Sequence, residues 1–187
     1  MKVFSKIIPI ILLLAVLTGC DKDERPDYYY RFKINGVQKE FRANRDANIV
    51  FIETGGLNTT TFTMVTGNDP NKNSLTIQLR TVEDVTQGVT YIMQEPVFVS
   101  GVLSPALTFL YLDENGKIFL GGRLQSENPG ARDNGSLIFT DITTEGSYGR
   151  FEAVVFDAED ETSELSARQA FTITDGEFFL PNFVSLR

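Results

Sequence analysis

The chain contains no histidine, no tryptophan and a single cysteine among its 187 residues. Without histidine it lacks the most common general base, the usual partner of a nucleophilic serine and the most common ligand of transition metals. One cysteine cannot form a disulfide within the chain, so the hydrophobic core must hold the fold alone. These absences exclude histidine-dependent catalysis and a disulfide framework.

Basic residues are few as well. Lysine and arginine total 17 against 25 aspartate and glutamate residues, which gives a formal net charge of −8 at pH 7. A chain of that sign repels phosphate groups, and no basic stripe overrides the repulsion. We therefore expect no nucleic-acid partner and no affinity for anionic lipid headgroups.

No apolar run is long enough for a permanent membrane-spanning helix. The longest candidate near the N-terminus, residues 7–17, is about half of the roughly 20 residues that a bilayer requires. Lys2 and Lys6 precede this run, and small residues and Cys20 follow it. That order is typical of a secretory signal peptide, which we expect to comprise residues 1–19.

The run Leu17-Thr18-Gly19-Cys20 resembles a bacterial lipobox. The resemblance implies a diacylglycerol on the Cys20 thiol, removal of the preceding peptide, and an acyl chain such as palmitate on the new N-terminus. One acyl chain binds a membrane only marginally, whereas two or more hold stably. The expected product is a lipoprotein that is permanently anchored to a membrane.

The segment after the cysteine refines this expectation. Residues 20–27 are strongly charged and contain a proline, which predicts a solvated, flexible tether. Lys22, Asp23 and Glu24 resemble the lysine-plus-two-acids export signal of Bacteroidota lipoproteins. The resemblance implies a surface-exposed position on the outer membrane, and a periplasm-facing lipoprotein is the alternative.

Strand signals recur along residues 28–187, which are expected to form a single all-β domain. We count about ten strands, and only residues 82–87 indicate a helical turn. Without helices for parallel crossovers, the sheet is expected to be antiparallel. The predicted fold is a two-layer β-sandwich, immunoglobulin-like or jelly-roll-like, and a closed lipocalin-like β-barrel is the alternative. Besides the hairpins below, the predicted strands include residues 48–53, 61–66, 74–81, 137–142 and 150–157.

Three pairs of adjacent residues tolerate positive φ and predict tight hairpin turns: Asn35-Gly36, Asn115-Gly116 and Asp175-Gly176. The first sets a register in which Ile34 faces Val37, so that one face of the hairpin is mostly apolar and the other is polar. The third is expected to reverse the chain and to pair Ile173 with Phe178.

Carboxylates, tyrosines and lysines remain for catalysis. The familiar hydrolytic chemistry left open to them is a two-carboxylate mechanism of the glycosidase type. Nothing in the sequence selects a pair of acids, and most acids fall in loops or at outward strand positions. We therefore expect no enzymatic activity.

Two acidic clusters offer oxygen ligands of the kind that calcium prefers. One lies in the turn around Asp113 and Glu114, and neither cluster has the spacing of an EF-hand loop. Calcium is accordingly a candidate cofactor. The denser cluster consists of Asp157, Glu159, Asp160, Glu161 and Glu164.

A carbohydrate-binding platform needs exposed aromatic rings, and the chain has six tyrosines but no tryptophan. The candidates for ligand contact are Tyr91, Tyr111 and Tyr148. The run at residues 28–30 alternates into the faces of the first hairpin, so we expect it to pack at the edge of the domain.

Several short motifs occur in the order seen in a group of small Bacteroidota surface lipoproteins. The resemblance covers most of residues 28–180, and it departs where relatives often have Gly-Thr-Phe instead of Gly149-Arg150-Phe151. It implies a secreted, β-sandwich-like lipoprotein and transfers no catalytic residue. Its motifs are Phe32-Lys33-Ile34-Asn35-Gly36, Gly88-Val89-Thr90-Tyr91, Gly135-Ser136-Leu137-Ile138-Phe139-Thr140, and Ile173-Thr174-Asp175-Gly176-Glu177-Phe178.

Three functions remain open at this stage. The leading hypothesis is a non-enzymatic module at the cell surface that binds a glycan or a protein. The second is a lipocalin-like carrier of a small apolar ligand, which requires an interior pocket. The third is a small carboxylate-based glycoside hydrolase, which requires two carboxylates in one cleft.

Overall fold

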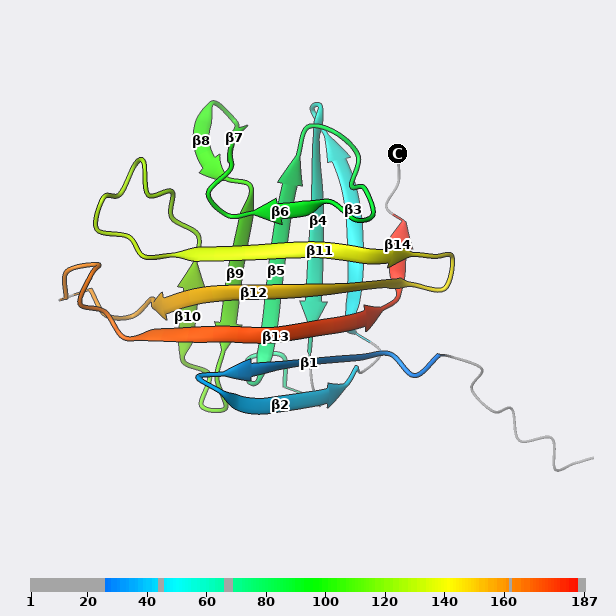
Figure 1. Cartoon of the computed structure of the whole chain (residues 1–187), viewed down its shortest axis with the longest axis horizontal. Helices are drawn as coiled ribbons and strands as arrows, with labels where there is room; N and C mark the ends of the chain where they lie inside the picture. Colours follow the sequence, from blue (N-terminus) through cyan, green and yellow to red (C-terminus); the bar gives the residue numbers. More distant parts are fainter. Residues whose placement is uncertain (1–25, 44–45, 66–68, 162, 185–187) are drawn as a thin grey trace, which may run out of the picture.

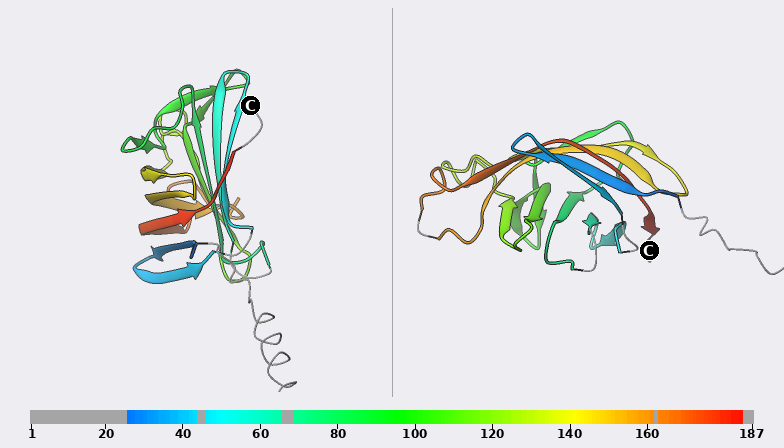
Figure 2. Two further views of the ribbon diagram at one scale, coloured as in Figure 1. Left: turned by 90° about the vertical axis from the view of Figure 1, so that its right-hand side faces the viewer. Right: turned by 90° about the horizontal axis from the view of Figure 1, so that it is seen from below.

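A computed structural model describes residues 26–43, 46–65, 69–161 and 163–184 of the chain. These residues form fourteen strands and contain no helix, which confirms the all-β class predicted from the sequence. Twelve strands share one large curled sheet, and two form a separate hairpin. The curled sheet folds over itself into two layers whose strands cross at a steep angle (Figures 1 and 2).

The first layer runs nearly vertically in Figure 1. Its central strands alternate apolar and polar residues, as predicted for residues 74–81, so that Leu75, Ile77 and Leu79 are fully buried. In hydrogen-bonding order its strands are β14 (Asn182–Val184), β3 (Asn48–Thr54), β4 (Leu57–Met64), β5 (Ser74–Thr81), β9 (Leu107–Leu112) and β10 (Ile118–Gly121).

The second layer runs nearly horizontally across the first (Figure 1). Its longest strands, β12 and β13, pair along almost their whole length and form the middle of the layer. In order its strands are β6 (Thr90–Ile92), β11 (Asn134–Ile142), β12 (Ser147–Asp157), β13 (Ala170–Leu180), β1 (Tyr29–Ile34) and β2 (Val37–Arg42).

The two layers are joined at one corner by a short contact between β10 and β12. Only the pairs Phe119–Asp157 and Leu120–Phe156 connect these strands. At the two ends of the strand path, β14 and β2 do not pair with each other among the described residues. The sheet is therefore an open sandwich or half-barrel, and the closed-barrel alternative is not what forms.

Aromatic side chains fill the space between the layers. Phe62 of β4 meets Phe178 of β13 edge-on, with ring centroids 5.1 Å apart, and Phe119 of β10 stacks on Phe171 of β13 at 4.1 Å. Phe62 and Phe178 are at most 1% exposed. Each such ring buries a large apolar area, and the pairs add favourable edge or stacking contacts across the interface.

The first hairpin forms in the predicted register. Ile34 faces Val37, Asn35 and Gly36 both adopt positive φ, and Phe32 and Ile34 are buried. Val37 is nevertheless 62% exposed on the edge strand β2. The hairpin thus has the predicted faces, and β2 adds Phe41 to the core, where its ring packs against Tyr30 at 5.2 Å.

The Asp175-Gly176 turn predicted from the sequence is wrong. These residues lie within the continuous strand β13, where the pairing shifts between Phe151–Gly176 and Ala153–Ile173. Asp175 takes the positive φ of 50°, which a β-bulge uses as readily as a hairpin does. A Cβ on Gly176 would lie 2.6 Å from a ring carbon of Phe151, so the glycine is required by close packing and not by a turn.

Two short strands, β6 and β14, were not predicted from the sequence, and β7 (Pro96–Val99) and β8 (Val102–Pro105) form a hairpin before β9. Strand β14 pairs in parallel with β3, so the expectation of a purely antiparallel sheet is wrong. The parallel pair forms because the chain crosses from the second layer to the first at Pro181, whose carbonyl accepts the Ile49 N–H. Residues 82–87 form no helical turn; they form a bend at Val82 and Glu83 and enter a tight turn at Gln87.

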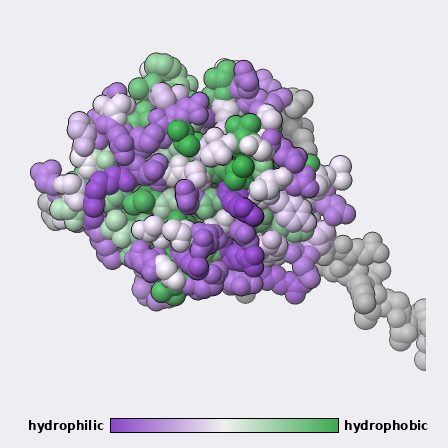
Figure 3. Space-filling model, in the orientation of Figure 1, coloured by the Kyte–Doolittle hydropathy of each residue, from purple (hydrophilic) through white to green (hydrophobic). Residues whose placement is uncertain are grey.

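The β7–β8 hairpin projects from the upper end of the domain in Figure 1. Its tip carries Phe98 and Val102, which are 72% and 64% exposed. In the matching view of Figure 3, hydrophilic residues cover much of the surface, and hydrophobic residues show both at this upper end and in patches across the middle of the face.

The packing of Phe151 on Gly176 predicts a specific loss of stability. Gly176→Ala should lower the free energy of unfolding by about 1–3 kcal/mol, because the added methyl group has no room beside the ring. Urea unfolding followed by circular dichroism measures the change. Gly130→Ala is the matched control, since its nearest neighbour, a Leu165 carbon, is 3.8 Å away, and it should change stability by less than about 0.5 kcal/mol. Equal effects in both variants would contradict the packing argument.

Candidate functional site

The three candidate tyrosines lie in different parts of the fold. Tyr111 is only 3% exposed and packs edge-on against Phe32, and burial raises its pKa to about 12. Tyr91 is also buried, and its hydroxyl accepts the N–H of Thr86 at 2.7 Å. Only Tyr148 shows a substantial part of its ring, which stacks on Phe179 at 4.0 Å. The structure therefore does not bring them together as a sugar-binding platform.

The tyrosines at the start of β1 pack as expected. Tyr28 is buried against Phe179, with ring centroids 4.8 Å apart, and its hydroxyl donates to the carbonyl of Glu145 at 2.5 Å. The chain is thereby pinned to the domain at its first described residues.

The lipidation and export residues, Cys20, Lys22, Asp23 and Glu24, lie outside the described residues. Their roles remain predictions from the sequence. In the described part of the chain, no helix has the length and apolar character needed to cross a membrane.

The acidic cluster after β12 is a set of local contacts. Asp157 is paired with Lys117, and Asp160 accepts the N–H of Ser163 at 2.9 Å. Glu159 and Glu161 lie on the same loop. Within the described ranges, no three acidic or cysteine side chains are grouped so that they could hold a metal ion, and calcium binding stays a prediction.

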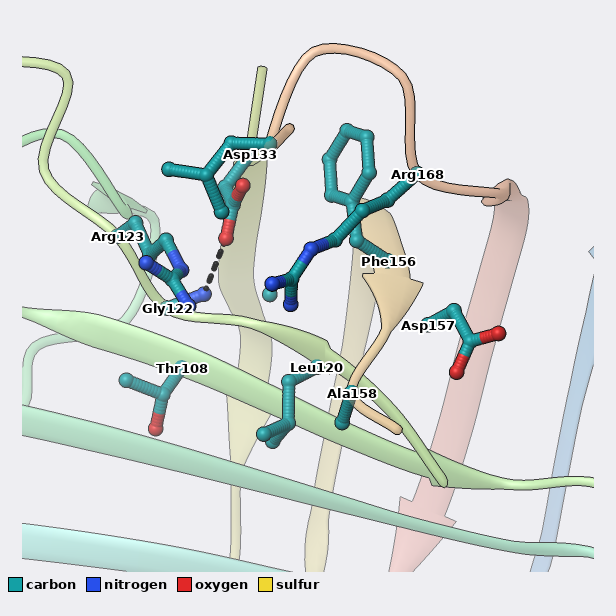
Figure 4. A pocket seen from close by; sticks show the side chains of 11 residues that line it. Thr108, Leu120, Gly122, Arg123, Asp133, Phe156, Asp157, Ala158 and Arg168 are labelled. Atoms are coloured by element: carbon teal, nitrogen blue, oxygen red, sulfur yellow. Dashed lines mark hydrogen bonds between the residues drawn. The ribbon is translucent and has the colours of Figure 1, made fainter. Parts of the chain in front are cut away.

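A partly enclosed cleft with charged and apolar lining residues lies at the corner where the two layers join, and we call it the corner cleft. Its volume is about 350 Å³, within the range of small-molecule sites. It is formed by the ends of β10 and β12 and by the loops that follow them (Figure 4). Its lining residues are Thr108, Leu120, Gly121, Gly122, Arg123, Asp133, Phe156, Asp157, Ala158, Leu165 and Arg168.

Two consecutive glycines shape the floor of the corner cleft. A Cβ on Gly121 would lie 2.8 Å from the carbonyl oxygen of Val154, and a Cβ on Gly122 would lie 3.2 Å from Thr108. Gly121 thus lets β10 come close to β12 at the corner. After it, the chain leaves the sheet and carries Arg123 to the rim.

Asp133 fixes the other side of the cleft. It is 4% exposed, and its carboxylate accepts the N–H of Gly122 at 3.0 Å (Figure 4). Gln94 links the two sides of this segment. Its side-chain amide donates to the backbone carbonyl of Asp133 at 2.8 Å and to that of Arg123 at 3.3 Å. These bonds hold the segment between β10 and β11 in one conformation.

Two guanidinium groups point into the cleft near the Asp133 carboxylate in Figure 4. They belong to Arg123, after β10, and Arg168, before β13. The Nε of Arg168 donates to the carbonyl of Ser163 at 3.3 Å, which orients its terminal nitrogens toward the cleft. No acidic side chain of the described residues forms an ion pair with either arginine, which is unusual in a chain with a net charge of −8.

Asp157, which lines the cleft, is held in an ion pair. The Lys117 ammonium lies 2.6 Å from the carboxylate of Asp157, whose side chain is 9% exposed. The bond to Lys117 lowers the pKa of Asp157, and the N–H of Glu159 adds to the effect, although burial opposes it. The same bond raises the pKa of Lys117. Both groups therefore stay charged near neutral pH.

Sequence reasoning did not single out Arg123, Asp133 or Arg168. Each follows or precedes a strand by one or two residues, and they are brought together only because the two layers meet at this corner. The Gly121-Gly122 pair directly after an apolar strand, followed by an arginine in an acidic chain, was the signal that could have indicated the site.

The Lys117–Asp157 pair predicts a pH-dependent contribution to stability. The pKa of Asp157 in the folded protein lies below its ordinary value of 3.8, so its contribution is present above that value and is lost as the pH falls through the folded pKa. Asp157→Asn should therefore lose less stability than the wild type between about pH 6 and pH 2. Urea unfolding at several pH values in this range measures the free energy of unfolding of each protein. Lys117→Met should reduce the dependence of that free energy on pH in the same way as Asp157→Asn. A wild-type slope in both variants would contradict the assignment.

Comparison with known proteins does not assign the chain to a family. No family model matches it, and no curated protein or solved structure is significantly similar to it. The resemblance to small Bacteroidota lipoproteins accordingly stays a prediction from the sequence.

Proposed function

We propose that the protein is a lipid-anchored, non-enzymatic binding module of the outer membrane surface that holds a glycan or protein ligand in the corner cleft. The observation that carries this proposal is the pair of guanidinium groups of Arg123 and Arg168, which face a concave, partly apolar site without an acidic partner among the described residues. A few polar groups set in apolar walls are typical of ligand sites.

The position of the cleft supports capture at a distance from the membrane. Tyr29, the first residue of β1, lies beside Phe179, and Phe179 lies beside Tyr148 at the start of β12. The cleft lies at the other end of β12, at Asp157. Nine residues of extended strand separate these ends by roughly 30 Å. A tether that joins the domain ahead of β1 would therefore leave the cleft at the far end of the molecule (Figure 1).

The chemistry of the cleft favours binding over hydrolysis. Asp133 accepts a backbone N–H, and Asp157 is paired with Lys117. A glycosidase needs one carboxylic acid with a raised pKa to protonate the leaving group, whereas Lys117 lowers the pKa of Asp157. This electrostatic arrangement suits fixed charges that orient a ligand.

A carboxylate-based glycoside hydrolase is the second candidate, because Asp133 and Asp157 both line the corner cleft. Hydrolysis would release a shortened product, whereas a binding module returns its ligand unchanged.

The carrier hypothesis has less support, since aromatic rings such as Phe62 and Phe178 occupy the interior between the layers.

A photo-crosslinking amino acid at Leu120 tests the proposal. Leu120 lines the cleft and is 47% exposed, so on intact cells the full-length protein should become joined to its ligand, and mass spectrometry should find that ligand chemically unchanged. The matched control is the same amino acid at Val37, which is 62% exposed on edge strand β2 and should give no such product.

Two results would contradict the proposal. Equal products from both positions would show that the cleft is not the binding surface, and a cleaved glycan at Leu120 would favour the hydrolase.

Protease added to intact cells should degrade the protein if it faces outward, and survival of the protein until the outer membrane is broken would place it on the periplasmic face.

A further inference from the structure

We infer that the corner cleft binds a carboxylate group on a compact ligand with an apolar face, and that Arg123 and Arg168 hold this carboxylate. The inference rests on the proposed function, because it names the ligand chemistry of the same cleft. Its observations are the local charge, the orientation of the two arginines, the apolar wall and the volume.

The lining of the corner cleft is less acidic than the chain as a whole. Arg123 and Arg168 bring two positive charges to it, and Asp133 and Asp157 bring two negative ones, so the lining is balanced in a chain whose net charge is −8. Asp157 is already paired with Lys117, and Asp133 accepts a backbone N–H. The binding of a singly charged anion therefore replaces the water around the guanidinium groups with charge-assisted hydrogen bonds.

The side chain of Arg168 and the backbone of Arg123 are held in place before any ligand arrives. Arg168 is oriented by its bond to the Ser163 carbonyl, and the backbone of Arg123 is held by Gln94. A planar guanidinium group matches the two oxygens of a carboxylate with two parallel N–H bonds. Such preorganisation lowers the entropy lost on binding, which favours a specific anion over diffuse attraction.

The remaining wall of the cleft is apolar. Leu120, Ala158 and Leu165 line it, and Leu120 is 47% exposed. Arg132 covers the ring of Phe156 at 5.1 Å, so that this ring also is fixed. A volume of about 350 Å³ lies at the small end of ligand sites, which suits a ligand body of about one ring.

A carboxylate fits these features better than a phosphate. A phosphate monoester carries about 1.5 to 2 negative charges near pH 7, and the carboxylates of Asp133 and Asp157 in the same lining repel such a group more strongly than a singly charged carboxylate. The apolar residues of the lining also disfavour the more highly charged anion, because a charge costs more to remove from water the larger it is. The carboxylate can be carried by an acidic sugar or by an aromatic acid.

Isothermal titration of the intact chain with matched pairs of probes tests the inference. Glucuronate is compared with glucose, benzoate with benzamide, and inorganic phosphate forms a fifth arm. At least one acid should bind about tenfold or more tightly than its neutral partner and should weaken as salt is added, since charge-assisted bonds carry the difference. The sugar and benzene pairs distinguish the two sources of the carboxylate.

Variants locate the binding. Arg123→Gln and Arg168→Gln should each reduce the affinity for that acid by roughly ten- to a hundredfold, and Arg168→Lys should retain part of it because the charge remains. Arg150→Gln removes the same charge from the outer face of β12, where the side chain is 70% exposed, and should leave the affinity unchanged. Thermal unfolding checks that each variant is folded, and the lysine variant serves if a glutamine variant is not.

The inference is overturned if both acids bind no more tightly than their neutral partners, if phosphate binds as tightly as the better acid, or if Arg150→Gln costs as much affinity as Arg168→Gln. Failure here is separable from failure of the proposed function. Crosslinking at Leu120 to an uncharged ligand would keep the binding function and reject the carboxylate, whereas absence of a Leu120 product rejects the function itself.

Discussion

The close approach of aromatic rings to glycine backbone is the constraint on which the second layer depends. Phe151 lies over Gly176 and Phe178 lies over Gly149, with the nearest ring carbons 2.6 Å and 2.4 Å from the positions that a Cβ would occupy. These contacts, together with the bulge at Asp175, let β12 and β13 coil while they remain paired. A long coiled pair can wrap over the first layer and bury both faces of the aromatic core.

The corner cleft follows from the same geometry. Because the strands of the two layers cross steeply, β10 can pair with β12 over only two residues before the strands diverge. Gly121 permits this short pairing, because a Cβ there would lie 2.8 Å from the carbonyl oxygen of Val154 in β12. The loops on the two sides of the divergence carry Arg123 and Arg168, so the site arises from the junction of the layers.

The sequence predicted the parts of the fold that depend on local signals. Asn35-Gly36 was sufficient to set the register of the first hairpin, because its strands flank the turn directly. Asp175-Gly176 carried the same local signal and failed, since the presence of Phe151 across the strand decided between a bulge and a turn. The cleft was out of reach for the same reason: Arg123 and Arg168 are distant in sequence, and only the pairing of β10 with β12 brings them together.

The ligand-binding surface that we propose is the corner cleft, at the end of the domain remote from the first residues of β1. Backbone amide chemical shifts of the intact chain, recorded by NMR during addition of glucuronate and of benzoate, test this most directly. We expect the largest changes at Gly122, Asp133 and Ala158, which surround the two guanidinium groups. Changes confined to the β7–β8 hairpin or to the exposed ring of Tyr148, or no changes for either acid, would contradict the account.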